Sequence, residues 1–161
     1  MKTGRVKRQT GFSVLELLAG IAMVGTLITV ALPAYDGYEE RMQLVEVQKD
    51  FGIIEMRIQR YFVSYGEYPP SLEVVGMDKD DPWGNPYRYM NMSSKTGNGK
   101  VRKKHGNVPV NNDFDLYSAG PDGDSRSPMN SVHSRDDIVR ADGGDFVGWA
   151  TEYCAKDGVK C

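Results

Sequence analysis

The stretch from Phe12 to Tyr35 is apolar and almost free of charge. It contains no Lys, Arg or Asp, and Glu16 is its single charged residue. A helix of about 20 residues crosses the hydrocarbon core of a bilayer at 1.5 Å per residue. The pattern over residues 12–35 therefore predicts a helix that is long and apolar enough to span a membrane.

The pattern changes after Tyr35, where apolar residues recur mostly at steps of three or four among charged ones. This period is typical of an amphipathic helix and predicts one over residues 36–65. Gly66 and the prolines of Tyr68-Pro69-Pro70 end it, because proline supplies no backbone donor and disfavours helix in the residue before it. A helix over residues 12–65 would be about 80 Å long, so a small domain could cover only part of it. The residues that show this spacing are Tyr38, Met42, Val45, Ile54, Ile58, Tyr61, Phe62 and Tyr65.

Residues 66–161 are rich in Gly, Pro, Asn and Asp and carry only short apolar patches. They predict loops around a small antiparallel sheet, packed on the amphipathic half of the helix, so that the fold class is α+β. The segment 81–89 is turn-rich and feeds an aromatic strand, whose Trp83, Tyr87 and Tyr89 can cover the helix. A second strand is expected at residues 114–117, followed by a Gly-Pro-Asp-Gly turn. A chain of 161 residues supports one such core.

The charges are divided unevenly along the chain. The first eleven residues hold four basic and no acidic side chains, whereas the rest holds sixteen basic and twenty-two acidic ones. By the positive-inside rule the basic end stays in the cytoplasm and the remainder is exported. An acidic remainder argues against nucleic acid as a partner. We expect the basic residues of segment 92–112 to form a solvated face, with contact to a neighbouring acidic subunit as the alternative: Lys95, Lys100, Arg102, Lys103 and Lys104.

The two cysteines, Cys154 and Cys161, both lie at the C-terminal end. They cannot form a metal site alone. In an exported domain they predict a small loop closed by a disulfide, which would hold an end that otherwise frays. In a cytosolic protein two free thiols would be the expectation.

Glu16 is the residue that an ordinary membrane anchor does not explain. An ionised carboxylate near one end of a membrane helix costs a few kcal/mol unless it is paired, so it indicates a functional site. An ordinary signal peptide is disfavoured, because the apolar stretch is long and no Ala-x-Ala-like site follows it. A generic single-pass anchor with a stray glutamate is the remaining alternative.

The run Gly11-Phe12-Ser13-Val14-Leu15-Glu16 resembles the processing site of type IV prepilins. In that family a short basic leader ends in Gly, and Glu is the fifth residue after the cut. The resemblance implies cleavage between Gly11 and Phe12 by a prepilin peptidase and N-methylation of Phe12. Pro33 falls at the twenty-second mature position, where family members commonly carry a proline that kinks or melts the helix.

Cleavage would create a cationic amino group on Phe12 that a neighbouring Glu16 could neutralise in a low-dielectric filament core. Because desolvation cancels much of the Coulomb attraction, the pair would act as a registry device more than as a source of net stability. The predicted organisation is therefore a cleaved leader over residues 1–11, a membrane or filament-core helix over 12–35, an amphipathic helix over 36–65 and a globular domain over 66–161.

Two acid-bearing stretches, residues 113–124 and 135–138, flank a flexible loop. Carboxylates and carbonyls suit calcium, which takes six to eight oxygen ligands, although turns without a ligand explain the same residues. The segments 81–87 and 116–138 resemble the major pseudopilin of type II secretion systems and its calcium loop. The later Trp149 and the terminal cysteines depart from that pattern. The resemblance implies calcium bound by the carbonyls of Leu116 and Ser118 and the carboxylates of Asp122, Asp136 and Asp137, with Asp124 as a further candidate.

The leading hypothesis is a structural subunit of a periplasmic type II secretion pseudopilus, anchored in the inner membrane by one helix. A type IV pilus or DNA-uptake pilus subunit is the alternative. The implied partners are copies of the chain in a helical filament, the prepilin peptidase, other pseudopilins and the inner-membrane assembly platform. An enzyme is not expected, because His105 and His133 lack metal-ligand spacing and no Gly-x-Ser-x-Gly or His-Glu-x-x-His motif is present.

Overall fold

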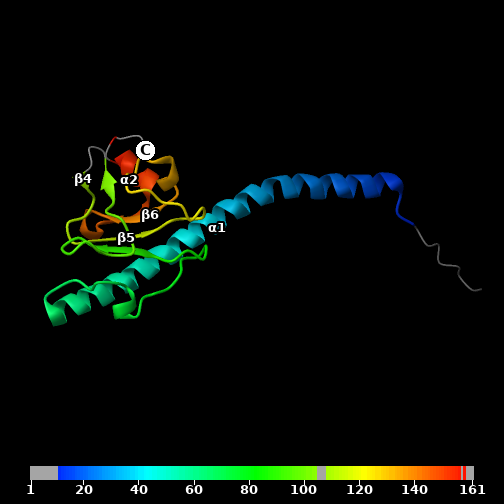
Figure 1. The fold of residues 1–161 in the computed structure, drawn as a ribbon. Coiled ribbons are helices and arrows are strands. Elements are labelled where there is room, and N and C mark those ends of the chain that lie inside the picture. The colour runs from blue at the N-terminus through cyan, green and yellow to red at the C-terminus, as the bar shows by residue number, and fades with distance from the viewer. Residues whose placement is uncertain (1–10, 105–107, 157, 159–161) are drawn as a thin grey trace, which may run out of the picture. The chain divides into compact units, whose positions relative to one another are not determined.

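The structure is a computed structural model that describes residues 11–104, 108–156 and 158, except for the side chains of residues 33, 34 and 36. The chain divides into two compact units, Met1–Arg41 and Met42–Cys161. The basic residues of the predicted leader and His105 lie outside the described residues. Figure 1 shows the fold and labels α1, α2, β4, β5 and β6.

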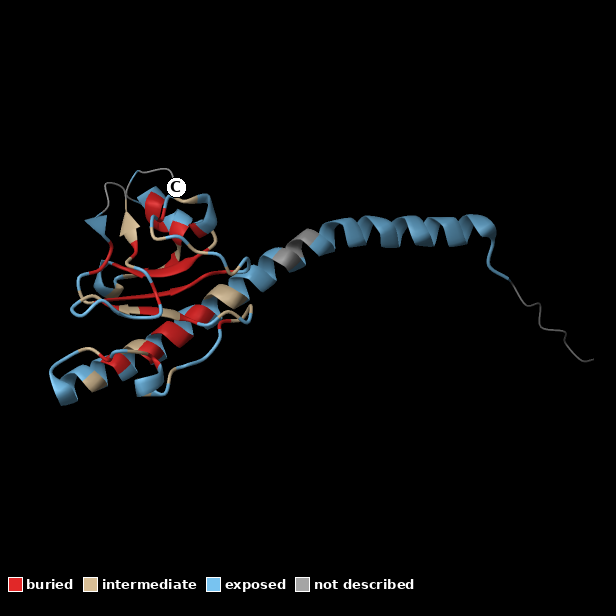
Figure 2. Ribbon diagram, in the orientation of Figure 1, coloured by how far each residue is buried: buried red, intermediate tan, exposed pale blue. Residues whose placement is uncertain are grey.

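A single long helix, α1 (Val14–Tyr65), contributes to both units. It ends where Gly66 adopts a φ of 76°, a left-handed conformation that glycine tolerates and that commonly follows a helix. The Gly66 N–H donates to the carbonyl of Phe62 at 2.8 Å. In the first unit, the described side chains of α1 are exposed up to Arg41, as Figure 2 shows by its pale blue ribbon.

The second unit contains a five-stranded antiparallel sheet in the order β2-β1-β5-β6-β7. A two-stranded antiparallel sheet pairs β3 with β4, and the short helix α2 follows β7 directly. The bounds of the strands and of α2 are β1 (Arg88–Asn91), β2 (Thr96–Gly97), β3 (Lys103–Lys104), β4 (Val108–Pro109), β5 (Phe114–Ser118), β6 (Ile138–Ala141), β7 (Phe146–Trp149) and α2 (Ala150–Lys156). The described residues also form the 3-10 turns η1 (Glu73–Val75), η3 (Val132–Ser134) and η4 (Asp142–Gly144).

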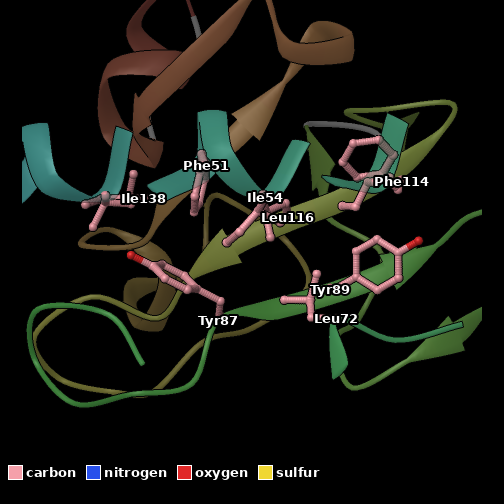
Figure 3. Packing of buried hydrophobic residues seen from close by; sticks show 10 residues of the cluster. Phe51, Ile54, Leu72, Tyr87, Tyr89, Phe114, Leu116 and Ile138 are labelled. Atoms are coloured by element: carbon pink, nitrogen blue, oxygen red, sulfur yellow. The ribbon is translucent and has the colours of Figure 1, made fainter. Parts of the chain in front are cut away.

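One face of the sheet packs on the second part of α1. Phe51 and Ile54 of the helix are fully buried and point toward the sheet, where Tyr87, Leu116 and Ile138 meet them (Figure 3). Alternate residues of a strand point to opposite faces, so this core takes every second residue of each strand. The main members of this first cluster are Val47, Phe51, Ile54, Ile58, Leu72, Tyr87, Tyr89, Phe114, Leu116 and Ile138.

The opposite face of the sheet is covered by α2 and by loop residues (Figure 1). Tyr117 and Val139 point to this side, and Tyr153 of α2 packs there at 1% exposure. Because both faces are covered, all five residues of β5 and all four of β6 are buried. The central strands therefore lack the alternation of apolar and polar residues that marks a half-exposed strand.

The α+β fold predicted from the sequence is confirmed, with a long N-terminal helix packed on a small antiparallel sheet. The expected cover by aromatic residues is also present: Tyr87 and Tyr89 are buried in the first cluster and Trp83 packs at its edge. The expected solvated basic face was wrong for Arg102, which is 1% exposed. Its side chain is buried because an acidic partner distant in the sequence lies beneath it, as described below.

Candidate functional site

The residues of the predicted processing site lie just before α1. Gly11 has no atom within 4 Å of the position where a Cβ would stand, and Phe12 is 84% exposed. Neither residue is helical. The peptide bond between Gly11 and Phe12 is thus in a non-helical, exposed segment, which is the arrangement that a peptidase requires. Cleavage and methylation stay predictions.

Ser13 and Glu16 form a reciprocal cap at the start of α1. The Glu16 N–H donates to Ser13 Oγ at 3.2 Å, and the Ser13 N–H donates to Glu16 Oε2 at 3.4 Å. This is the capping box Ser-x-x-Glu, which satisfies two backbone donors that a helix start leaves unpaired. The sequence analysis missed it, although the spacing is readable. Glu16 therefore has a partner within its own chain before any neighbour approaches.

The start of α1 is long and apolar enough to cross a membrane by length and composition. Its exposed large side chains run from Val14 to Leu32, with Glu16 as the acidic residue of the first turn. Pro33 lies within the bounds of α1, but its side chain is outside the described part of the structure, so its predicted role in assembly stays a prediction.

The loop between β5 and β6 carries the four aspartates of the predicted calcium site, while Leu116 and Ser118 lie in β5. The two ends of this loop approach closely at Gly120, where a Cβ would come within 2.1 Å of the Asp136 carbonyl oxygen and where φ is 65°. Glycine is required here for both reasons. The segment that begins at Asp81 is hydrogen-bonded to the same part of the chain. Ser118 Oγ donates to Asp81 Oδ2 at 2.5 Å, and Asn85 Nδ2 donates to the Gly120 carbonyl at 2.8 Å.

Asp137, at the end of this loop, is fully buried against Arg102. The guanidinium of Arg102 forms an ion pair with Asp137 Oδ2, and the two side chains are 1% and 0% exposed. Ser125 Oγ donates to the same carboxylate oxygen at 2.8 Å. Burial raises the pKa of Asp137 to about 6, while Arg102 and Ser125 oppose part of that rise. Asp137 is thus committed to a partner inside the protein.

The other predicted ligands do not converge on Asp137. Asp124 Oδ2 contacts His133 Nδ1 at 2.7 Å, and both side chains are about half exposed. Asp122 Oδ1 accepts from the Asp124 N–H at 2.8 Å, while Asp136 Oδ2 accepts weakly from the Asp122 N–H at 3.4 Å.

Leu116 and Ser118 belong to β5, which pairs with both neighbouring strands. Over the described residues no group of three His, Cys, Asp or Glu side chains is placed to hold a metal ion. The residues as arranged do not fit calcium, whose binding stays a prediction.

Arg140 joins the sheet to the helix at a second buried charge. Its Nε contacts Glu55 of α1, its Nη2 contacts Asp113 Oδ2 at 2.7 Å, and its Nη1 donates to Asp113 Oδ1 at 2.9 Å. The guanidinium also stacks 4.0 Å from the centroid of the Phe114 ring. Burial raises the pKa of Asp113, but the hydrogen bonds and charge of Arg140 outweigh it, so that the pKa lies below its usual value. The sequence analysis missed this cluster.

Cys154 is buried in the second cluster, at 6% exposure, and is disulfide-bonded. The sequence contains one other cysteine, Cys161. That residue lies outside the described residues, so the pairing of Cys154 with Cys161 stays a prediction. A bond at Cys154 would tie the C-terminal end to α2 and, through Tyr153, to the sheet.

Comparison with known proteins finds both fimbrial proteins and type II secretion proteins. The chain is 29% identical over 145 residues to a fimbrial protein of Neisseria meningitidis serogroup A, over 83% of the chain and 84% of that protein. It is 31% identical over 106 residues to a fimbrial protein of serogroup B, over 66% of the chain and 61% of that protein. It is 25% identical over 140 residues to the type II secretion system core protein G of Klebsiella pneumoniae, over 73% of the chain and 89% of that protein.

No family model matches the chain, and no solved structure matches it significantly. The relatives nevertheless agree with what the molecule shows. A long apolar helix that continues into a small α+β domain, and that begins just after an exposed Gly-Phe junction, is a pilin-like architecture. The chain belongs to the type IV pilin-like proteins. As a member of that family it is a structural protein and not an enzyme, and its long N-terminal helix accords with membrane anchorage.

Proposed function

We propose that this chain is a structural subunit of the periplasmic pseudopilus of a type II protein secretion system. The observation that carries the proposal is the alignment with the core protein G of Klebsiella pneumoniae, which extends over 73% of this chain and 89% of that protein. The turn at residues 81–87, which resembles the major pseudopilin, supports it. Asp81 Oδ1 accepts the N–H groups of Trp83 and Asn85 at 3.1 and 2.8 Å and so holds that turn in place.

In this proposal the leader, residues 1–11, is removed by a prepilin peptidase between Gly11 and Phe12, and Phe12 is methylated. The helix over residues 12–35 is held in the inner membrane until assembly. In the filament, the amino group of Phe12 in one subunit meets Glu16 of its neighbour. Glu16 then exchanges its contact with the Ser13 N–H for a full positive charge, which is a stronger, charge-assisted interaction.

A subunit of a type IV pilus or of a DNA-uptake pilus is the second candidate. It is favoured by the two fimbrial proteins of Neisseria meningitidis, one of which aligns over 84% of its length. The disulfide-bonded Cys154 also favours it, because the terminal cysteines depart from the pattern of the major pseudopilin. Both candidates share leader cleavage and filament assembly. They differ in whether the filament stays in the periplasm or extends from the cell surface.

The two candidates are separated by deleting the gene in the source organism and measuring secretion and surface filaments in parallel. The proposal expects type II substrates to accumulate in the periplasm while surface pili persist. Complementation with the intact gene should restore secretion. Loss of surface filaments with normal secretion would instead identify a pilus subunit and reject the proposal.

Assembly through Glu16 is tested in the same strain. A Glu16→Ala variant should be processed to mature size yet fail to restore secretion, because the amino group of Phe12 would have no partner. Glu40→Ala, which removes an exposed acid farther along the same helix, is the matched control and should restore secretion. Normal secretion with Glu16→Ala would contradict the assigned role.

A further inference from the structure

The loop between β5 and β6 encloses a cation that belongs to the chain itself. The Arg102 side chain is 1% exposed and its guanidinium reaches three oxygen atoms. Nη1 donates to Ser125 Oγ and to the Arg126 carbonyl, both at 2.7 Å, and Nη2 is paired with the Asp137 carboxylate. A carboxylate, a carbonyl and a hydroxyl thus surround one positive charge.

These three kinds of oxygen are also those that a hard divalent cation takes from a protein. The sequence predicts calcium at this loop with Asp137 among its ligands, yet Arg102 already neutralises Asp137. A second cation beside the guanidinium would be repelled by it at short range. In this structure the loop therefore has no charge left for calcium to balance at Asp137, and Asp124 is paired with His133.

Arg102 is placed by its backbone as well as by its side chain. Its N–H donates to Asp115 Oδ2 at 2.6 Å, and its carbonyl accepts the Val110 N–H at 3.1 Å. The guanidinium lies 4.6 Å from the centroid of the Tyr117 ring. A planar group that stacks on a ring and donates from two nitrogens is specific to arginine, and lysine does not replace it.

We propose that the Arg102 guanidinium is the built-in cation of the β5–β6 loop, and that the domain keeps this loop closed without a divalent metal ion. The geometry assigns Arg102 the task of drawing Ser125, the Arg126 carbonyl and Asp137 together. Arg102 Nε and Asp137 Oδ1 are buried without a hydrogen-bond partner among the described residues, so the direct pairing is between Nη2 and Oδ2, and Ser125 bridges the two side chains. The inference does not depend on whether the filament is a pseudopilus or a pilus.

The test is thermal unfolding of the full-length chain in detergent, followed by the fluorescence of Trp83 and Trp149. The native chain should give the same melting temperature in excess chelator and in millimolar calcium, because a ligand that does not bind adds no stability. Arg102→Ala should lower the melting temperature by roughly 10 °C, since it leaves a buried carboxylate unpaired. Lys100→Ala removes an exposed charge two residues away and should change little.

A chemical rescue distinguishes the role of a cation from mere packing. Methylguanidinium should raise the melting temperature of Arg102→Ala and leave that of the native chain and of Lys100→Ala unchanged. Should Arg102→Ala fail to fold, Arg102→Lys replaces it, with a smaller loss expected because the charge is kept. The proposal is overturned if chelator lowers the melting temperature of the native chain, if the Arg102 variants melt as the native chain does, or if methylguanidinium gives no rescue.

Discussion

Replacing Arg140 with methionine should destabilise the domain mainly by leaving two carboxylates without their cation. The Arg140 side chain is 2% exposed and makes two contacts with Asp113 and one with Glu55. Methionine fills a similar length and keeps an apolar contact with the Phe114 ring. The variant Arg140→Met therefore removes charge and hydrogen bonds while creating little empty space.

The magnitude follows from the exposure of the partners. Removing one member of a fully buried ion pair costs about 3–5 kcal/mol. Asp113 and Glu55 are 23% and 27% exposed, so both can regain part of their hydration once Arg140 is gone. We therefore expect a smaller loss of about 2–3 kcal/mol in the free energy of unfolding. For a domain of this size, that loss lowers the melting temperature by roughly 10 °C.

The pH dependence of this loss identifies its cause. The pKa of Asp113 is depressed in the folded state, so its ionisation adds stability above the unfolded pKa of about 3.9, and this contribution is lost as the pH falls through the folded pKa. The difference in the free energy of unfolding between the native chain and Arg140→Met should therefore reach its full size at pH 7 and become smaller below about pH 4.

Urea unfolding of both chains at several pH values measures this difference, with Trp83 and Trp149 as probes. Their rings are 6.2 Å apart at the edge of the first cluster and separate on unfolding. Arg135→Met, at an exposed position just before β6, is the control and should change the free energy of unfolding little at any pH. A difference that does not change with pH would refute the electrostatic explanation and assign the loss to packing.

Three further outcomes are expected. Gly11→Asp should block processing, so that a gel shows only full-length protein. Gly20→Ala, at an open position inside α1, is the control and should be processed. Mature protein from Gly11→Asp would refute the cleavage site. Phe51→Ala should cost about 3–5 kcal/mol in urea unfolding, because Phe51 is fully buried, and a loss as small as that of an exposed residue would refute its place in the core. Ser13→Ala should remove the cap at a cost of about 1 kcal/mol, seen as faster hydrogen exchange at the Glu16 amide, and unchanged exchange would exclude the capping box.

The elements that depend on local pattern could be predicted from the sequence. The apolar period and the following glycine and prolines predict a helix end near Tyr65, and α1 ends there. The aromatic segment around Tyr87 and Tyr89 predicts a strand against the helix, and β1 follows it. The cluster Phe114, Leu116 and Tyr117 predicts a short strand, and β5 contains it. In each case residues close in the sequence carry the signal.

The buried charges could not be predicted in this way, because their partners are far away in the sequence. Arg102 stands in a basic, glycine-rich stretch that is typical of a solvated face, and its partner Asp137 is 35 residues distant. Arg140 finds Glu55 across 85 residues. Nothing local marks either arginine as buried, since the sheet has to form before these side chains meet. The capping box at Ser13 and Glu16 is different, because its spacing is visible and was overlooked.

Polar contacts between α1 and the rest of the domain give a reason for the charged residues of α1 at this interface. Apolar side chains at helical spacing would still meet a flat apolar sheet if α1 slid along it by a whole turn, because hydrophobic contact is not directional. Asp50 and Glu55 remove that freedom. Asp50 accepts from the Tyr87 hydroxyl at 2.7 Å and pairs with Lys79 at 2.6 Å, while Glu55 meets Arg140.

A slide of α1 by one turn would take the buried Asp50 and the partly exposed Glu55 away from these partners, and a buried carboxylate without a partner costs several kcal/mol. The two acids therefore specify one register between α1 and the sheet more than they add net stability. The helix of a filament subunit must enter the filament at a defined position. The number of helix residues ahead of the domain must therefore be the same in every copy. The register between α1 and the sheet, set by Asp50 and Glu55, fixes this number.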